Sequence, residues 1–116
     1  MGGACGASQN RERDPFLASI SSNQSSETRI NMSCRRLGRD GAYAVGRALR
    51  TNTTLKHLFL GWNDIQDAGV QTICFSLAQN DTLRTLNLAG NGVTDEGAQC
   101  AAQLLQTNSS LTQLSL

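Results

Sequence analysis

The sequence predicts an α/β solenoid, in which a strand–turn–helix unit is repeated and the strands form one parallel sheet on the concave side of a right-handed horseshoe. Three observations predict this fold. A leucine skeleton recurs at a spacing of 28 residues, beginning at Leu55, Leu83 and Leu111. Asparagine, aspartate and glycine landmarks keep the same register. Within each unit, the apolar spacing changes from strand alternation to the three-and-four spacing of a helix.

The repeat sets the expected domain organisation. We expect one domain over 27–116, divided into an edge repeat at 27–54, regular repeats at 55–82 and 83–110, and a truncated repeat at 111–116. Glu27 and Arg35 stand where the regular units have leucine and asparagine, as is common in terminal repeats. Because arginine cannot hold a turn as asparagine does, we expect a less regular first turn. Residues 1–26 are poor in apolar side chains, and only Pro15 to Ile20 could pack on the domain, so we expect a mostly disordered N-terminal tail.

Each strand is expected to alternate between leucines that face the core and side chains that face the concave surface. Leu58 and Leu60 illustrate the inward positions in the second unit. Asn63 and Asn91 follow the strands. We expect these two side chains to hydrogen-bond the backbone of the turn, because the turn has no sheet or helix partners of its own.

Each helix is expected to bury one face, because its apolar residues are spaced by three and four. These residues are Ala42, Val45 and Leu49, then Val70, Ile73 and Leu77, then Ala98, Ala101 and Leu105. Thr94 is the expected N-cap of the last helix. Gly69 and Gly97 are expected where a helix and its neighbour approach closely. An asparagine after each helix is expected to close it in the left-handed conformation. These asparagines are Asn52, Asn80 and Asn108.

Composition and spacing exclude several classes of function. Ten basic and nine acidic residues nearly balance, and no stripe of basic and aromatic residues predicts a nucleic-acid partner. No metal-ligand spacing, phosphate loop or nucleophile motif occurs, so we expect no cofactor, metal site or catalysis. Cys74 and Cys100 are expected to be free, small helix residues near the core. No apolar run predicts a membrane span or a signal peptide, so we expect a cytoplasmic protein.

The 28-residue unit Leu-x-x-Leu-x-Leu-x-x-Asn-x-Ile, with aspartate and glycine before an amphipathic helix, resembles the ribonuclease-inhibitor-like class of leucine-rich repeats. The resemblance covers about 27–116. It is similar to the repeats of NOD-like receptors and of the Ran GTPase-activating protein. The resemblance implies a cytosolic module that binds protein partners and carries no catalytic residues. The residues shared by this family form its scaffold, so the motif does not indicate which partner is bound.

The concave face supplies the candidate binding residues. They are Arg29, Asn31, His57, Phe59, Trp62, Thr85, Asn87 and Gln113. Phe59 and Trp62 are the most informative, because exposed aromatic residues are typical of protein-binding hot spots. The alternative is that Trp62 packs on its own turn or on the tail. His57 has no predictable carboxylate or nucleophile partner and is expected to be a surface contact.

A basic cluster lies in the first turn, at Arg35, Arg36 and Arg39. It could bind a phosphate, an acidic partner or a lipid headgroup, or act on a GTPase as an arginine finger. We favour the simpler interpretation, in which the arginines are solvated and pair with Asp40 or Glu27.

The N-terminus suggests lipid attachment. Gly2 becomes the first residue once Met1 is removed, as N-myristoylation requires, although Gly6 replaces the preferred serine or threonine. Cys5 is a candidate palmitoylation site, and two acyl chains anchor a protein stably where one does not. The alternative function is therefore a lipid-anchored regulator of a membrane-associated GTPase or signalling protein.

The last residue, Leu116, is a core leucine of the repeat pattern. We expect either a fragment of a longer repeat protein, without a function of its own, or a final strand that pairs with a partner or a second copy. We favour the fragment.

Overall fold

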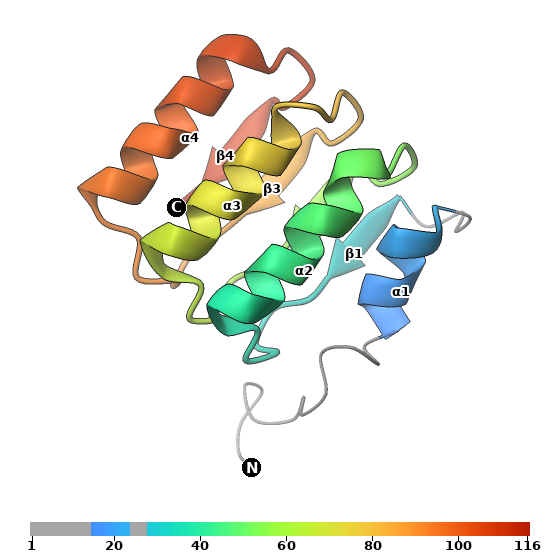
Figure 1. Ribbon diagram of the computed structural model, residues 1–116, viewed down its shortest axis with the longest axis horizontal. Helices are drawn as coiled ribbons and strands as arrows, with labels where there is room; N and C mark the ends of the chain where they lie inside the picture. Colours follow the sequence, from blue (N-terminus) through green and yellow to red (C-terminus); the bar gives the residue numbers. More distant parts are fainter. Residues whose placement is uncertain (1–14, 24–27) are drawn as a thin grey trace.

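The computed structural model describes residues 15–23 and 28–116, which form four helices and four short strands in alternation (Figure 1). The elements are α1 (Pro15–Ser22), β1 (Arg29–Asn31), α2 (Gly38–Thr51), β2 (His57–Phe59), α3 (Gln66–Leu77), β3 (Thr85–Asn87), α4 (Asp95–Thr107) and β4 (Gln113–Ser115). No helix in these two segments is long and apolar enough to cross a membrane.

The strands form one parallel sheet in the order β1-β2-β3-β4. The pairing register equals the sequence period, because Leu58 lies opposite Leu86, which lies opposite Leu114. Helices α2, α3 and α4 lie side by side over one face of the sheet (Figure 1). Each strand–helix–strand connection therefore advances the stack by one repeat. The predicted α/β solenoid with a parallel sheet is confirmed.

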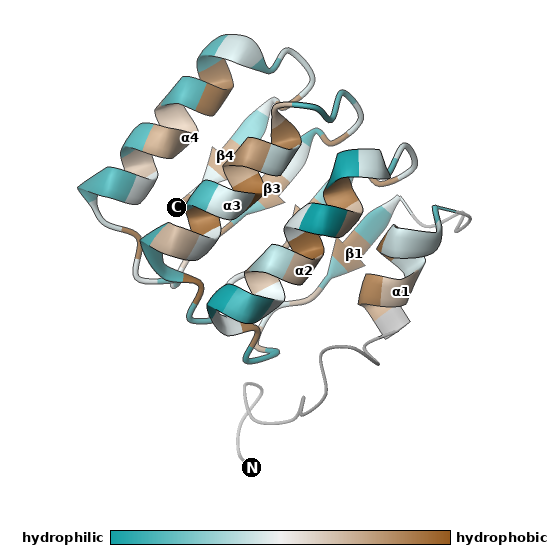
Figure 2. Cartoon of the chain, in the orientation of Figure 1, coloured by the Kyte–Doolittle hydropathy of each residue, from teal (hydrophilic) through white to brown (hydrophobic). Residues whose placement is uncertain are grey.

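The core lies between the sheet and the helices. Leu58, Leu60, Leu86 and Leu88 are all 0% exposed and supply its strand side. The helix side comes from the buried faces of α2 and α3, where every residue of the predicted apolar spacing is buried. Hydrophobic and hydrophilic residues alternate along each helix, as one-sided burial requires (Figure 2).

The buried face of α4 differs from the prediction. Ala101 and Leu104 are buried, whereas Ala98 is exposed and Leu105 is 50% exposed. The equivalent residue one repeat earlier, Leu77, is 1% exposed. The reason is a missing neighbour: α4 packs beside α3, but no further helix of the described chain packs on the other side of α4.

Helix α1 corrects the prediction of a tail that is disordered as far as residue 26. Ile20 is 1% exposed and belongs to the core, and Phe16 and Leu17 pack partly buried against it. A helix of eight residues is unstable alone, so its contact with α2 and the core stabilises it. The Asn52 side-chain amide also donates to the carbonyl of Ile20 at 3.0 Å. Helix α1 thus occupies the place of a preceding helix.

The asparagines that follow the helices were predicted to be left-handed, and this prediction is wrong. Asn52 has φ −74° and Asn108 has φ −94°, both extended backbone. Their side chains act instead. The Asn80 side-chain amide donates to the carbonyls of Leu49 at 2.8 Å and Asn52 at 3.1 Å. Its Oδ1 accepts from the backbone N–H of Leu83 at 2.9 Å. Each asparagine therefore joins the end of its own helix to the end of the preceding one.

The asparagines that follow the strands also act across repeats. Asn63 Nδ2 donates to the Met32 carbonyl at 2.9 Å, and Asn63 Oδ1 accepts from the Arg35 N–H at 2.6 Å. Asn91 repeats this pattern and accepts from the Asn63 N–H at 2.8 Å. The prediction that they hold the turns is correct, but each holds mainly the turn before its own. The expected irregularity at Arg35 is therefore wrong.

The first two turns share one backbone pattern with three alternating left-handed residues, and the third turn has the first two of these and then the extended Thr94. The first turn has Cys34, Arg36 and Gly38 at positive φ, the second has Trp62, Asp64 and Gln66, and the third has Gly90 and Gly92. Every position of the pattern differs in residue type from one turn to the next. Side chains other than glycine are costly in this conformation.

Thr94 is the N-cap residue of α4, as predicted, but its side chain makes no capping hydrogen bond, and Asp67 of α3 supplies the cap instead. Asp67 Oδ1 accepts from the backbone N–H of Thr94 at 2.8 Å and of Gly97 at 3.1 Å. The Thr94 hydroxyl donates to Asp67 Oδ2. A Cβ at Gly97 would lie 2.5 Å from Asp67 Oδ1, and one at Gly69 would lie 2.9 Å from Ala42 Cβ. Both glycines therefore permit close approach between neighbouring helices, as expected.

Candidate protein-binding face

The strands bring most of the predicted binding residues into two rows across the exposed face of the sheet. The parallel register aligns Arg29, His57, Thr85 and Gln113 in one row, and Asn31, Phe59, Asn87 and Ser115 in the other. In each strand a buried leucine lies between the two row residues and packs into the core, and this packing holds both rows in place. We name this surface, together with Trp62, the concave face.

Phe59 and Arg29 form a stacked pair on this face. The guanidinium carbon of Arg29 lies 4.7 Å from the centroid of the Phe59 ring, within the range of a cation–π contact. Phe59 is half-buried, whereas Arg29 is exposed. The arginine thus covers one part of the ring, and Phe59 presents a smaller apolar surface than an unshielded phenylalanine would.

Trp62 is 65% exposed and lies at the edge of the concave face, at the beginning of the second turn. It packs against the turn of the following repeat: a Cβ added at Gly90 would lie 2.4 Å from the Trp62 indole. The alternative in which Trp62 packs on a turn is therefore correct in part, although the neighbouring turn is the one it covers. Its backbone has φ +58°, an unusual conformation for a bulky residue.

Basic residues gather where the strands begin. Arg29 and His57 head β1 and β2, and Lys56 and Arg84 precede β2 and β3. The Arg84 N–H donates to the Lys56 carbonyl at 2.7 Å, so the two lie in adjacent positions of the sheet. Lys56 and Arg84 were not among the predicted site residues, although their spacing of 28 residues could have identified them.

The remaining polar residues of the face are partly engaged with the backbone. Asn31 Oδ1 accepts from the Ser33 N–H, and Asn87 Oδ1 accepts from the Ala89 N–H, both at 2.9 Å. The Thr85 hydroxyl donates to the Gln113 side chain at 3.4 Å. These bonds fix the side-chain oxygens and make the centre of the face a preorganised polar surface.

The basic cluster in the first turn is divided by the fold. The guanidinium carbon of Arg35 lies 4.6 Å from the centroid of the Phe16 ring, so this arginine contributes to the contact with α1. Arg36 and Arg39 are exposed. Gly2 and Cys5, the predicted lipidation sites, lie outside the described residues.

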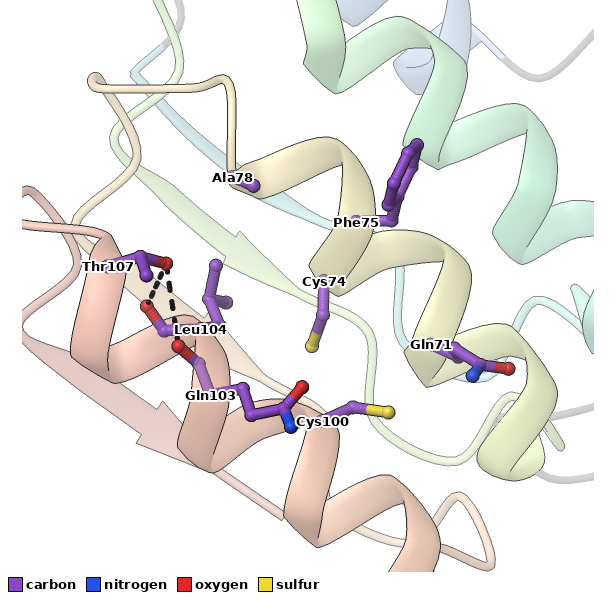
Figure 3. A pocket seen from close by; sticks show the side chains of 8 residues that line it. All are labelled: Gln71, Cys74, Phe75, Ala78, Cys100, Gln103, Leu104 and Thr107. Carbon is purple, nitrogen blue, oxygen red and sulfur yellow. Dashed lines mark hydrogen bonds between the residues drawn. The ribbon is translucent and has the colours of Figure 1, made fainter.

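The helix face of the molecule carries a groove between α3 and α4 with a volume of about 360 Å³. Cys74, Phe75, Cys100 and Leu104 are among the residues that line it (Figure 3). Cys74 and Cys100 are free thiols, as predicted. Burial raises the pKa of the Cys74 thiol to about 12, and the nearby Cys100 adds to this rise.

One carboxylate has a pKa that the fold changes. The hydrogen bond from the Thr94 side chain, followed by that from its backbone, holds the pKa of Asp67 below its usual range. Asp67 lies on the helix side and caps α4, so this shift reports a structural role. Among residues 15–23 and 28–116, no group of three or more histidine, cysteine, aspartate or glutamate side chains could hold a metal ion.

Comparison with known proteins agrees with this architecture. Residues 51–74 and 79–100 match the family described as Leucine Rich repeat, and the alternating strands and helices with a parallel sheet are consistent with this repeat type. No curated protein matches the sequence.

Two solved structures share the fold. One is titled Leiomodin-1 Actin-Binding Site 2, with 26% sequence identity and a TM-score of 0.79, covering 84% of this chain and 57% of that one. The other is the tropomodulin C-terminal domain of Caenorhabditis elegans, with 13% identity and a TM-score of 0.77, covering 91% of this chain and 63% of that one. The chain therefore spans less than two thirds of either structure.

Proposed function

We propose that this chain is a non-catalytic protein-binding module and that its concave face binds the partner. The observation that carries the proposal is Trp62, a large aromatic side chain that is 65% exposed at a backbone position that favours glycine. Strained residues persist where the surrounding structure imposes them, and they cluster at functional sites. Trp62 lies beside the two rows of the sheet, where an aromatic anchor and polar neighbours form the usual composition of an interface.

The leiomodin structure suggests actin as the first partner to test. That structure is titled an actin-binding site and shares 26% identity over 84% of this chain. The basic residues at the starts of the strands favour a partner whose contact surface is acidic. Actin binding is a proposal for this chain, and it is narrower than the proposal that the concave face binds a protein.

The test compares two exposed aromatic residues on opposite sides of the molecule. Phe75 on α3 is 69% exposed and provides the matched control for Trp62. We expect Trp62→Gly to weaken actin binding about tenfold or more, the effect of removing a hot spot, and Phe75→Ala to leave it unchanged. Sedimentation with actin measures both. If Phe75→Ala has the larger effect, the helix face binds and the proposal for the concave face is wrong.

If the unaltered protein does not bind actin, only the narrower proposal fails. Proximity labelling in cells with the same variants then tests the broader one. A protein labelled by the unaltered chain and by Phe75→Ala, but not by Trp62→Gly, identifies the partner of the concave face. Equal labelling by all three chains contradicts the use of this face.

A cytoplasmic location and a lipid anchor are separate proposals that rest on the sequence. Gly2 and Cys5 are the proposed acylation sites, and they would make the module a lipid-anchored regulator of a membrane-associated GTPase or signalling protein. Feeding cells a clickable myristate tests the first step. Label that disappears in Gly2→Ala supports the anchor, and an unlabelled protein contradicts it.

A further inference from the structure

Two free thiols on neighbouring helices face the same groove. Cys74 is on α3 and Cys100 is on α4, and both line the groove of about 360 Å³ (Figure 3). Cys74 is 6% exposed, whereas Cys100 is half-buried. The two residues differ in access to solvent but belong to one cavity.

The repeat itself shows that these two side chains are neighbours. One repeat earlier, a Cβ at Gly46 would lie 3.3 Å from Thr72 Cγ2. Adding the 28-residue period converts Gly46 into Cys74 and Thr72 into Cys100. Cys74 and Cys100 therefore occupy a pair of positions that lie in contact one repeat earlier, and Cys100 is near enough to contribute to the raised pKa of Cys74. The absence of a side chain at Gly46 lets α2 and α3 approach closely, whereas Cys74 needs room, and the groove lies at this point between α3 and α4.

We propose that Cys74 and Cys100 form a dithiol modification site, in which a peroxide oxidises the pair to a disulfide that links the second and third repeats. The Cys100 thiol loses its proton, the thiolate attacks a peroxide oxygen, and the O–O bond breaks. Cys100 becomes a sulfenic acid, and the leaving hydroxide takes up the released proton to form one water. The Cys74 sulfur then attacks the Cys100 sulfur. The S–O bond breaks and a second water leaves with the Cys74 proton. Two electrons pass from the thiols to the peroxide.

The environments of the two thiols assign these roles. Cys100 is accessible from the groove and meets the oxidant first. Cys74 is buried, and its pKa of about 12 keeps it protonated, so it resists direct oxidation. It reacts only with a sulfur held beside it. Cys100 is therefore the attacking residue, and Cys74 resolves the sulfenic acid.

Peptide mapping provides the first test. Trypsin cleaves after Lys56 and Arg84, so the two cysteines fall in separate peptides, 57–84 and 85–116. After treatment of the full chain with hydrogen peroxide, we expect these two peptides to be joined in the monomer, with the mass of two hydrogens lost. Reduction should separate them. Linkage only between two molecules would overturn the proposal.

Variants separate the steps. In Cys74→Ala we expect the sulfenic acid of Cys100 to persist and to be trapped by dimedone, whereas Cys100→Ser should form neither the acid nor the link. Equal trapping at Cys100 in the unaltered chain and in Cys74→Ala would overturn the proposal. A further readout is the melting temperature of the unaltered chain, which should rise on oxidation and return on reduction, because the link restricts the unfolded chain. An unchanged melting temperature in linked protein would show that the link distorts the helices and would contradict the proposed geometry.

Discussion

Trp62 and Gly90 occupy equivalent places in successive turns, and they are in contact. Both have left-handed backbone, with φ +58° at Trp62 and φ +73° at Gly90. Glycine adopts this conformation without a Cβ penalty, whereas tryptophan does so at a cost of about 1–2 kcal/mol. The Trp62 indole lies over Gly90, and it fits there because Gly90 has no side chain.

This contact predicts coupling between the two positions. Gly90→Ala should lower the free energy of unfolding by about 2–3 kcal/mol, because the new Cβ meets both a left-handed backbone and the Trp62 ring. In a Trp62→Gly background the ring is gone, and the cost should fall to about 1 kcal/mol. Urea denaturation of the four proteins measures the difference. Equal costs in both backgrounds would mean that the indole does not rest on Gly90.

Asp67 predicts a dependence of stability on acid. Its folded pKa is lowered, so its contribution is present above the unfolded value of 3.8 and is lost as the pH falls through the folded pKa. At pH 7 the melting temperature of Asp67→Ala should lie below that of the unaltered chain, and the gap should close in acid below pH 3.8. Asp81→Ala is the control, since that carboxylate is exposed and its backbone is not left-handed. A gap that does not depend on pH would contradict the capping role.

For single residues, the sequence predicted which face a side chain lies on better than it predicted which residues the side chain contacts. Strand alternation placed Arg29, Phe59 and Asn87 on one face, because the side-chain period of a strand is fixed. It did not predict that Asp67 caps α4, because the capped N–H groups lie in the next repeat. Nor did it show which turn Trp62 covers. Contacts between repeats depend on the distance between stacked layers, and this distance cannot be inferred from the sequence of one repeat.

Among the elements, the turns depend most on their neighbours. Asn63 is 1% exposed, and its side chain bonds the backbone of the first turn as well as that of its own strand. Removing it leaves several buried polar groups of the backbone without partners. Such groups are costly, at about 1–3 kcal/mol each.

We therefore expect Asn63→Ala to lower the free energy of unfolding by about 3–5 kcal/mol. Amide hydrogen exchange should quicken most at Arg35, whose N–H donates to Asn63, although this residue is 28 positions away. The matched control is Asn31→Ala, which removes an exposed asparagine and one local bond. Its cost should stay below about 1 kcal/mol. Faster exchange confined to the turn that contains residue 63 would contradict the link between repeats.

Helix α1 shows why one element escaped prediction. Residues 15–22 include the apolar residues Phe16, Leu17 and Ile20, but they lie in a polar segment and show no repeat register. Their helix depends on burying Ile20 and on placing Phe16 against Arg35. Periodicity identifies elements that repeat, and α1 occurs once. The regular helices were predicted because their apolar spacing recurs, and the α4 face was predicted wrongly because the spacing alone does not show which sides have neighbours.

For the whole molecule, stability is expected to depend on contacts between adjacent layers, because each repeat of a stack contacts mainly its neighbours. The central layer should therefore matter most. Leu86 lies in β3 between two strands and is 0% exposed. Leu105 lies on the outer side of α4 and is 50% exposed.

This contrast gives a matched pair of truncations. Leu86→Ala should lower the free energy of unfolding by roughly 2–5 kcal/mol, which is enough to unfold a stack of this size. Leu105→Ala should cost less than about 1 kcal/mol, although the repeat spacing alone would place both leucines in the core. Thermal denaturation followed by circular dichroism compares them. If Leu86→Ala melts like the unaltered chain, the register of the sheet is wrong.

The asparagine bonds have a consequence for synthesis on the ribosome. The turn at Arg35 is complete only when Asn63 is present, and the turn at Asn63 only when Asn91 is present. A nascent chain that has just produced one repeat therefore holds an unfinished turn until 28 more residues have emerged. Folding should lag translation by one repeat, with each newly made segment closing the one before it.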